Sequence, residues 1–393
     1  MYSTCQYTKS KQEMRFFFIC RVKSDRIRSM EVEKRRIVSI DALRGMDMVL
    51  LSGGAVVLWH ALCAGMGGDV PGWLAQQFRH AEWGAGFTCW DLVMPLFLFI
   101  TGCSMPMAFA RYREQGRIRT LWRVLRRVVL LFVLGMVVQG NLCSGEPQHM
   151  SLFCNTLQAI AAGYLISSVV MLLWGWRGQS ACCVVLMVAY WALLRFVPYG
   201  EQPGGLFQPQ NNLAYYIDCL LQGHWQDGTP YTWILTSLNF GAITLMGVLG
   251  GTGILAAPGM KTAGWLVLAG CGCLLGAMAL EMDTPLIKHL FTTTMVLWSG
   301  GWCLLLLALF HVVFDRLKGT AWLAYPLQVV GCNALLAYML TNTPGMGGRS
   351  LWSSIAYPLL RWAENPLLYE GLSYGLLWLM LWFLYRHHAF LRV

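Results

Sequence analysis

Long apolar runs constrain the fold of this chain more than any other feature of its sequence. A helix needs about 20 mostly apolar residues to cross a bilayer, and ten stretches approach that length. The chain is 56% hydrophobic and only 12% charged, whereas a soluble domain carries about a quarter charged residues. We therefore predict an all-α, polytopic membrane protein with about ten transmembrane helices. The expected ranges are 37–62, 90–110, 121–140, 152–174, 180–197, 233–255, 262–280, 290–314, 321–341 and 371–386.

The rest of the chain adds one short apolar stretch, one long loop and a basic N-terminal segment. Residues 351–362 are too few to span a bilayer and predict an eleventh, re-entrant or interfacial helix. The loop at about 198–232 is rich in Pro, Gly, Gln and Asn and is expected to form a lid. One transmembrane domain, residues 37–393, is expected to follow the basic segment, residues 1–36. Residues 1–29 differ from the rest and fit an upstream extension or a functional tail.

The distribution of Lys and Arg predicts the orientation, because basic flanks of spans stay on the cytoplasmic side. With alternate loops taken as cytoplasmic, 23 of the 29 Lys and Arg lie inside, five lie outside, and Arg44 lies within the first span. Both termini are therefore predicted to be cytoplasmic, and His80 to face away from the cytoplasm. The basic segment 111–127 can also attract anionic lipid or an anionic cytoplasmic ligand. Because the basic residues flank spans, no nucleic-acid partner is expected.

The first span contains three ionisable residues. Placing such side chains in a membrane costs free energy, so they indicate either a functional site or a structural ion pair. Asp41, Arg44 and Asp47 follow one another at three-residue steps, so they are expected near one helical face. Such a cluster can neutralise itself and lock the span to its neighbours. Alternatively, it forms a polar mouth for an anionic ligand that enters from the cytoplasm.

His80 and Asp91 stand directly before the second span. Histidine is the side chain best suited to accept a proton near neutral pH, although a single loop histidine is more often structural. Asp91 lies eleven residues later at the start of the apolar run. It is expected either to cap that helix or to orient the His80 ring.

Further polar residues occur at the predicted outward ends of later spans or within them. Asn155 and Gln158 lie at the outward entrance of the fourth span, Lys288 and His289 at that of the eighth, and Asn333 inside the ninth. Each alone fits an interhelical hydrogen bond, whereas together at one membrane level they would line a cavity.

The fourteen cysteines predict no metal site, because they show no zinc-binding spacing and no accompanying histidines. Most lie in predicted spans and are interpreted as small apolar residues. Cys143 and Cys154 flank a short outward loop and would pair in an oxidising compartment.

Several motifs in order resemble the heparan-α-glucosaminide N-acetyltransferase family of transmembrane acyltransferases, nearest its bacterial members. They are "RRIVSIDALRGMDM", "RHAEWGAGFTCWDLVMPLFLFITGCSMPMAF", "LQAIAAGYL", "TPLIKHLFTTTMVLW" and "VVGCNALLAYML", and they extend from about residue 35 to 341. The His-Ala-x-Trp element followed by Asp-Leu-Val-x-Pro is the most specific of them. The chain departs from the family at Ala159, where Arg is frequent, so a cationic contact is absent there.

The resemblance implies that acetyl-CoA binds from the cytoplasmic side and that its acetyl group reaches an amino sugar on the opposite side. It also implies that the active-site histidine is His80, in agreement with the outward position expected from the charge distribution. His80 would act as the general base or carry the acetyl group, and Asp91 would orient and stabilise its ring.

The remaining assignments are hypotheses about the two substrates. The nucleotide of acetyl-CoA is expected at a basic mouth formed by Asp41, Arg44, Asp47, Arg126 and Arg127. The acceptor, a glucosamine-type sugar or another glycan, is expected to contact Trp83, Asn155, Gln158, Lys288 and Asn333. Trp83 and Trp90 would stack on the sugar or anchor the protein at the bilayer interface.

Two other functions stay open. The chain could O-acetylate an exported glycan, or it could transport a small molecule. No internal repeat or matched pair of broken helices is evident in the sequence, which counts against transport. The expected location is the bacterial inner membrane, with His80 on the periplasmic side. The sequence does not decide between a monomer and a homodimer.

Overall fold

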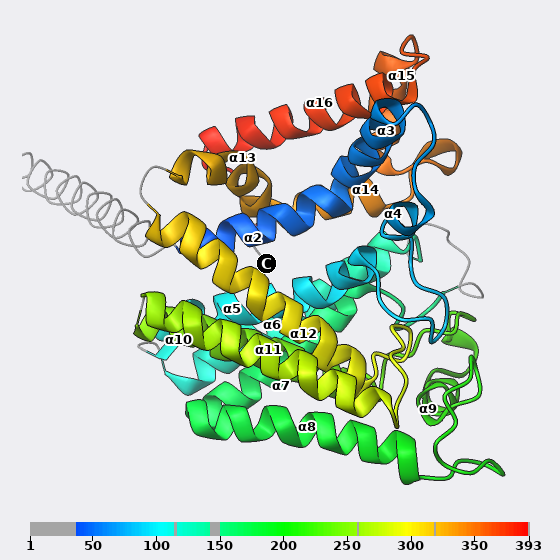
Figure 1. The fold of residues 1–393 in the computed structure, drawn as a ribbon, viewed down its shortest axis with the longest axis vertical. Coiled ribbons are helices and arrows are strands. Elements are labelled where there is room, and N and C mark those ends of the chain that lie inside the picture. Colours follow the sequence, from blue (N-terminus) through cyan, green and yellow to red (C-terminus); the bar gives the residue numbers. More distant parts are fainter. Residues whose placement is uncertain (1–36, 114–115, 142–149, 258, 318–319, 392–393) are drawn as a thin grey trace, which may run out of the picture. The chain divides into compact units, whose positions relative to one another are not determined.

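The computed structural model describes residues 37–113, 116–141, 150–257, 259–317 and 320–391, which are mostly helical (Figure 1). The chain divides into residues 1–38 and a helical body, residues 39–393, and the description below concerns the body. The predicted N-terminal segment 1–36 lies outside the described residues. Within the described residues only three isolated β-bridges accompany the helices, so the predicted all-α class is confirmed.

The helices alternate with short connections. Their bounds are α2 Val38–Val49, α3 Ala55–Gly65, α4 Gly72–Gln76, α5 Val93–Arg113, α6 Arg117–Val138, α7 Thr156–Leu173, α8 Trp176–Phe196, α9 Leu213–Gln222, α10 Ser237–Ala256, α11 Met260–Glu281, α12 Thr293–Phe310, α13 Ala321–Cys332, α14 Ala334–Asn342, α15 Leu351–Leu360 and α16 Pro366–Arg386.

Eight helices in the described part of the chain are long and apolar enough to cross a membrane. The bent pair α13 and α14 makes a ninth if it counts as one span. The predicted range 121–140 coincides with α6, which has 22 residues but carries five arginines, and its crossing stays a prediction. The predicted short helix at 351–362 is present as α15. The predicted lid, 198–232, includes the helix α9.

Two of the spans are broken. In the first, a π-helical segment, Leu50–Gly54, separates α2 from α3, and Gly53 has a φ of 114° that favours glycine. In the other, α13 and α14 meet at 61° next to Asn333. The two breaks lie near each other, since α14 packs against Leu50–Gly54. The expectation of no paired broken helices was therefore wrong, because tertiary packing can satisfy backbone groups that a break exposes.

Helix α10 is the centre of the body and packs against α5, α7, α8 and α12. Glycines allow its backbone to approach α5, as small residues do between membrane helices. A Cβ atom at Gly247 would lie 2.0 Å from the Phe99 carbonyl oxygen, and one at Gly251 would lie 2.3 Å from that of Cys103. The sequence element "GVLGG" therefore fixes which face of α10 meets α5. Farther from this centre, α16 packs along α3 and α13 (Figure 1).

Candidate active site

The loop before α5 is shaped by one buried carboxylate. Asp91 is the third residue of a 3-10 turn, Cys89–Leu92, and its Oδ2 accepts hydrogen bonds from the Thr88 N–H at 3.2 Å and the Ala81 N–H at 3.1 Å. Asp91 therefore ties the two ends of the His80–Asp91 loop together. The expected capping role is present in the form of a capping box whose first residue is Thr88.

The second oxygen of Asp91 is directed at His80. The distance from Asp91 Oδ1 to His80 Nδ1 is 2.9 Å, so the predicted contact between acid and ring is present. The Asp91 side chain is 2% exposed, whereas that of His80 is 45% exposed. One side of the ring is therefore held by a buried anion, and the other side stays accessible to a ligand.

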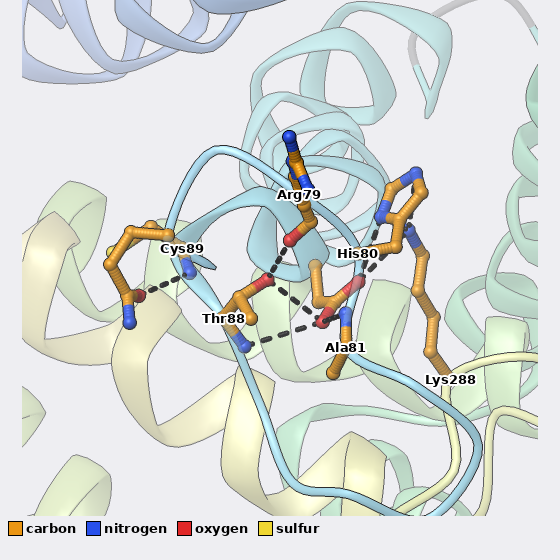
Figure 2. A network of polar contacts seen from close by, with 8 residues as sticks. Arg79, His80, Ala81, Thr88, Cys89 and Lys288 are labelled. Carbon is orange, nitrogen blue, oxygen red and sulfur yellow. Dashed lines mark hydrogen bonds and ion pairs between the residues drawn. The ribbon is translucent and has the colours of Figure 1, made fainter. Parts of the chain in front are cut away.

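Lys288 joins this pair from the loop before α12, 208 residues away in the sequence (Figure 2). Its Nζ lies 2.7 Å from His80 Nδ1, 3.3 Å from His80 Nε2 and 3.2 Å from Asp91 Oδ1. The side chain is 10% exposed. Burial lowers the pKa of the Lys288 ammonium and the Asp91 carboxylate opposes this effect. The three side chains thus form a compact His-Asp-Lys cluster.

The cluster opens into a cavity of about 330 Å³, which is within the range of small-ligand sites. The cavity is lined by the first residues of two helices and by loop residues that precede two others. These residues are Val93 of α5, Thr156 of α7, Trp233 before α10 and Lys288 before α12. Because helix N-termini carry partial positive charge, those of α5 and α7 favour negative charge that develops in the cavity. Leu51, from the break in the first span, also lines it.

Amide and hydroxyl groups form a polar part of the cavity wall. Asn155 begins α7, where its Oδ1 accepts the Leu157 N–H at 2.9 Å and the Tyr338 hydroxyl at 3.4 Å. Its Nδ2 donates to Gln139 at 3.4 Å, and both Gln139 and Tyr338 line the same cavity. These groups can bind the hydroxyl groups of a sugar.

Gln158 is close to this wall in sequence but lies behind it. The side chain is fully buried, and its Oε1 accepts the Cys154 and Asn155 N–H groups while its Nε2 donates to the Leu152 carbonyl. Its amide thus completes the capping box of α7. Contact with an acceptor stays a prediction.

Aromatic rings surround His289, the residue after Lys288. The Trp83 ring stacks on it at 5.1 Å between centroids, and the Tyr231 ring lies at 4.3 Å. Trp83 also donates to the Phe207 carbonyl at 2.8 Å. Burial, together with the charge of Lys288, lowers the pKa of His289 to about 4. Tyr231 and Trp90 line the cavity, whereas Trp83 is not among its lining residues and its contact with an acceptor stays a prediction.

Asn333 lies apart from this site, at the break between α13 and α14. Its Nδ2 donates to the Ala389 carbonyl at 3.2 Å, and its Oδ1 accepts the Leu391 N–H at 3.1 Å. The side chain therefore ties the broken span to the segment after α16. It is not among the residues that line the cavity.

The ionisable residues of the first span do not form the expected three-membered cluster. Arg44 contacts Asp41 at 3.6 Å, but Asp47 is 1% exposed and neither of its carboxylate oxygens has a hydrogen-bond partner in the described residues. The interpretation as a self-neutralising cluster of three was wrong, because within the described residues Arg44 pairs with Asp41 and the buried Asp47 carboxylate has no hydrogen-bond partner.

The two arginines of α6 differ from each other. Arg126 is exposed, whereas Arg127 lies over the Tyr164 ring at 4.4 Å. The buried Nε of Arg127 has no hydrogen-bond partner within the described ranges. The contribution of either residue to a donor site stays a prediction.

Sequence reasoning missed one wall of the cavity, formed by Asp227, Thr229 and Tyr231. An Asx-type turn holds this segment, since Asp227 Oδ1 accepts the Thr229 N–H at 3.0 Å and the Thr229 hydroxyl at 2.8 Å. The only sequence signal was the turn-forming "QDGTPY" inside the predicted lid.

The described residues allow only a partial check of the metal and disulfide predictions. No group of three or more His, Cys, Asp or Glu suited to a metal ion occurs in the part of the chain that the structure describes. Cys143 lies outside the described residues, so its pairing with Cys154 stays a prediction.

Comparisons with known proteins agree with the resemblance found in the sequence. Residues 36–202 match the family model described as a domain of unknown function, DUF5009. The chain is 23% identical to the heparan-alpha-glucosaminide N-acetyltransferase of Homo sapiens over 368 residues, which covers 77% of this chain and 52% of that protein. It is 22% identical to the Mus musculus protein of the same name, covering 77% and 53%. The chain therefore spans about half the length of these curated relatives. The resemblance to this family is confirmed.

Proposed function

We propose that this protein is a membrane-embedded acetyltransferase that transfers the acetyl group of acetyl-CoA to the amine of a glucosamine-type sugar. The observation that carries the proposal is the His80–Asp91 contact of 2.9 Å at the wall of the 330 Å³ cavity. The curated relatives bear the name of an acetyltransferase for a glucosaminide, which supports the same reaction class and acceptor.

His80 is the group that removes the proton of the acceptor. An ammonium ion cannot attack a thioester, so the sugar amine must lose a proton before or during the attack. In the general-base route, His80 Nε2 takes this proton while Nδ1–H donates to Asp91, which stabilises the imidazolium. In the covalent route, the ring first accepts the acetyl group and then passes it to the amine.

The cavity provides electrostatic support for this step. Attack on the carbonyl carbon moves negative charge onto the carbonyl oxygen, and preorganised dipoles that stabilise this charge accelerate acyl transfer. The N-termini of α5 and α7, at Val93 and Thr156, supply such dipoles. On the acceptor side, Asp227 offers a carboxylate in the cavity wall, which favours a cationic amino sugar over a neutral glycan.

The donor is proposed to reach His80 through the helical body from the other end of the spans. Acetyl-CoA carries phosphates that need cationic partners and amide groups that need hydrogen-bond partners. Arg44 and Arg126 are the proposed phosphate partners. The Asp47 carboxyl and Arg127 Nε are buried and have no hydrogen-bond partner among the residues that the structure describes, so they are suited to the arm between phosphate and thioester.

The proposed location is the bacterial inner membrane, with His80 on the periplasmic side. Asp91 precedes the 21-residue helix α5 and the basic segment 111–127 begins in its last turn, so the two lie at opposite ends of this helix. A helix of this length extends about 30 Å, the thickness of the bilayer core.

Cysteine labelling tests this orientation. In a background whose native cysteines do not react, Gly67→Cys should be labelled by an impermeant thiol reagent in intact spheroplasts, whereas Gln115→Cys should be labelled only after lysis. Gly67 is exposed in the loop after α3. The reverse labelling pattern would contradict the proposed sides.

The activity test uses purified protein, radiolabelled acetyl-CoA and three acceptors: glucosamine, a glucosamine-terminated disaccharide and neutral N-acetylglucosamine. We expect label on the two amines, none on the neutral sugar, and no transfer by His80→Gln. Label on hydroxyl groups of the neutral sugar would instead assign O-acetylation.

Transport is the second candidate, because the broken first span lines the cavity through Leu51, and broken spans form substrate sites in transporters. Proteoliposomes that accumulate radiolabelled glucosamine unchanged, without acetyl-CoA, would favour it. Labelled sugar recovered only in acetylated form would support the acetyltransferase.

A further inference from the structure

The position of Lys288 suggests a role beyond binding the acceptor. We propose that Lys288 is a second catalytic residue, the acid that protonates the departing thiolate of coenzyme A. This assignment rests on the proposed acetyltransferase function. It starts from the contacts of Lys288 Nζ with both ring nitrogens of His80, at 2.7 and 3.3 Å.

Lys288 is suited to this role by its surroundings. Lys288 is the only Lys or Arg among the described residues that line the cavity. Its Nζ lies 3.3 Å from His80 Nε2, the atom that takes the amine proton, so both groups reach the same carbonyl carbon. Partial burial lowers its pKa, which makes the ammonium a stronger acid toward a thiolate than a solvated lysine is.

The hydrogen-bond geometry requires protons to be shared within the cluster. His80 Nδ1 lies 2.9 Å from Asp91 Oδ1 and 2.7 Å from Lys288 Nζ. A protonated Nδ1 can donate to Asp91 but cannot accept from the ammonium, and an unprotonated Nδ1 can accept from the ammonium but cannot donate to Asp91. An imidazolium and an ammonium at this distance also repel each other strongly. The site therefore favours one proton moving between the ring and Lys288.

The resulting reaction balances without an external acid or base. The amine nitrogen forms a bond to the acetyl carbon while His80 takes one amine proton. The C–S bond then breaks, its electron pair stays on sulfur, and Lys288 gives that sulfur a proton. His80 next returns that proton from Nε2 to the neutral Lys288 amine across the 3.3 Å contact. The products are the N-acetylated sugar and the free thiol, and both side chains regain their starting states.

Substitutions of Lys288 separate proton donation from charge. Lys288→Met removes both, whereas Lys288→Arg keeps the charge but has a group that does not release a proton in proteins. We expect kcat with acetyl-CoA to fall about 100-fold in both variants, while the Kd for acetyl-CoA, measured by thermal shift, changes less than about threefold. Lys261→Met, at an exposed lysine on α11, is the matched control and should keep normal kcat.

Chemical rescue tests proton donation without the change of shape that arginine introduces. Lys288→Cys treated with 2-bromoethylamine regains an ammonium that can donate a proton, whereas treatment with 2-bromoethyltrimethylammonium restores charge without a proton. We expect only the first reagent to restore kcat, by at least about 20-fold relative to the untreated variant. Wild-type protein treated identically controls for reaction at native cysteines, including the exposed Cys89.

The results distinguish the two levels of the proposal. If Lys288→Arg keeps kcat within about fivefold of the wild type, or if both reagents rescue equally, proton donation by Lys288 is refuted and its charge alone matters. If the wild-type protein transfers no acetyl group to any amine, the proposed function itself fails.

Discussion

Two similar histidine–aspartate pairs, one contacted by Lys288 from the loop before α12 and one in the segment after α12, differ in their surroundings. Before the helix, Lys288 meets His80 and Asp91, whose Nδ1–Oδ1 distance is 2.9 Å. In the π-helical segment after it, His311–Arg316, His311 Nδ1 lies 2.8 Å from Asp315 Oδ2. By ring–carboxylate geometry alone, the two pairs are equivalent.

Access and the third partner distinguish them. The His311 side chain is 0% exposed, and its buried Nε2 has no hydrogen-bond partner among the described residues. Its aspartate is held by the N–H and hydroxyl of Ser39, at 3.2 and 2.5 Å, which connects α2 to the end of α12. The His80 ring instead faces a cavity and contacts a cation. A histidine–aspartate pair is therefore suited to chemistry only where a ligand can reach the second nitrogen.

The largest expected difference between the two pairs concerns catalysis. His80→Gln should lower kcat at least about 1,000-fold, because glutamine cannot accept a proton, while the melting temperature changes by less than a few degrees. Initial rates with radiolabelled acetyl-CoA and a thermal unfolding scan measure both effects. Near-normal turnover by His80→Gln would show that His80 is not catalytic, and the two histidine–aspartate pairs would then not differ in function.

Asp91→Asn is expected to affect both chemistry and folding, because the carboxylate holds the His80 ring and also the backbone of its loop. We expect kcat to fall about 100-fold, and the free energy of unfolding to fall by about 1–2 kcal/mol as one charged hydrogen-bond acceptor becomes neutral. Steady-state kinetics and denaturant titration separate the contributions. A loss of stability with normal kcat would limit Asp91 to the capping role.

Asp315→Asn should show the converse behaviour at the other end of α12. His311 and Ser39 would lose a charged partner, so the free energy of unfolding should fall by about 1–3 kcal/mol. Activity per folded molecule should stay within about twofold of the wild type, since neither group faces the cavity. A selective loss of kcat in well-folded Asp315→Asn protein would contradict the structural role.

The smallest predicted effect concerns pH and His289. Its pKa is lowered from 6.5 to about 4, first by burial and then by the charge of Lys288. Below pH 6.5 the unfolded chain takes up a proton that the folded chain does not, so this residue's contribution to stability is lost as the pH falls from 6.5 to 4. Melting temperatures should decline less over this range in His289→Gln than in the wild type. Identical declines would show that His289 ionises equally in both states.

Local sequence patterns were sufficient to predict the helical class and most helix positions, whereas the joint role of His80 and Asp91 was implied by the family resemblance. Spanning helices satisfy their backbone hydrogen bonds internally, so hydropathy along the chain identifies them. His80 and Asp91 are only eleven residues apart, and one loop brings them together. The turn at Gly53 also has a local signal in "SGG", although its role as a break in the first span was not predicted.

Tertiary structure alone decided which distant residues complete the site. Lys288 is 208 residues from His80, and Asn155 and Tyr231 reach the cavity from two further segments. It also separated Asp47 from the Asp41–Arg44 pair and placed Asn333 against the segment after α16. These outcomes depend on how the spans pack, through close contacts such as that of Gly247 with Phe99. Hydropathy shows that a helix is apolar enough for a membrane, but the side chains it meets are set by the shapes of its neighbours.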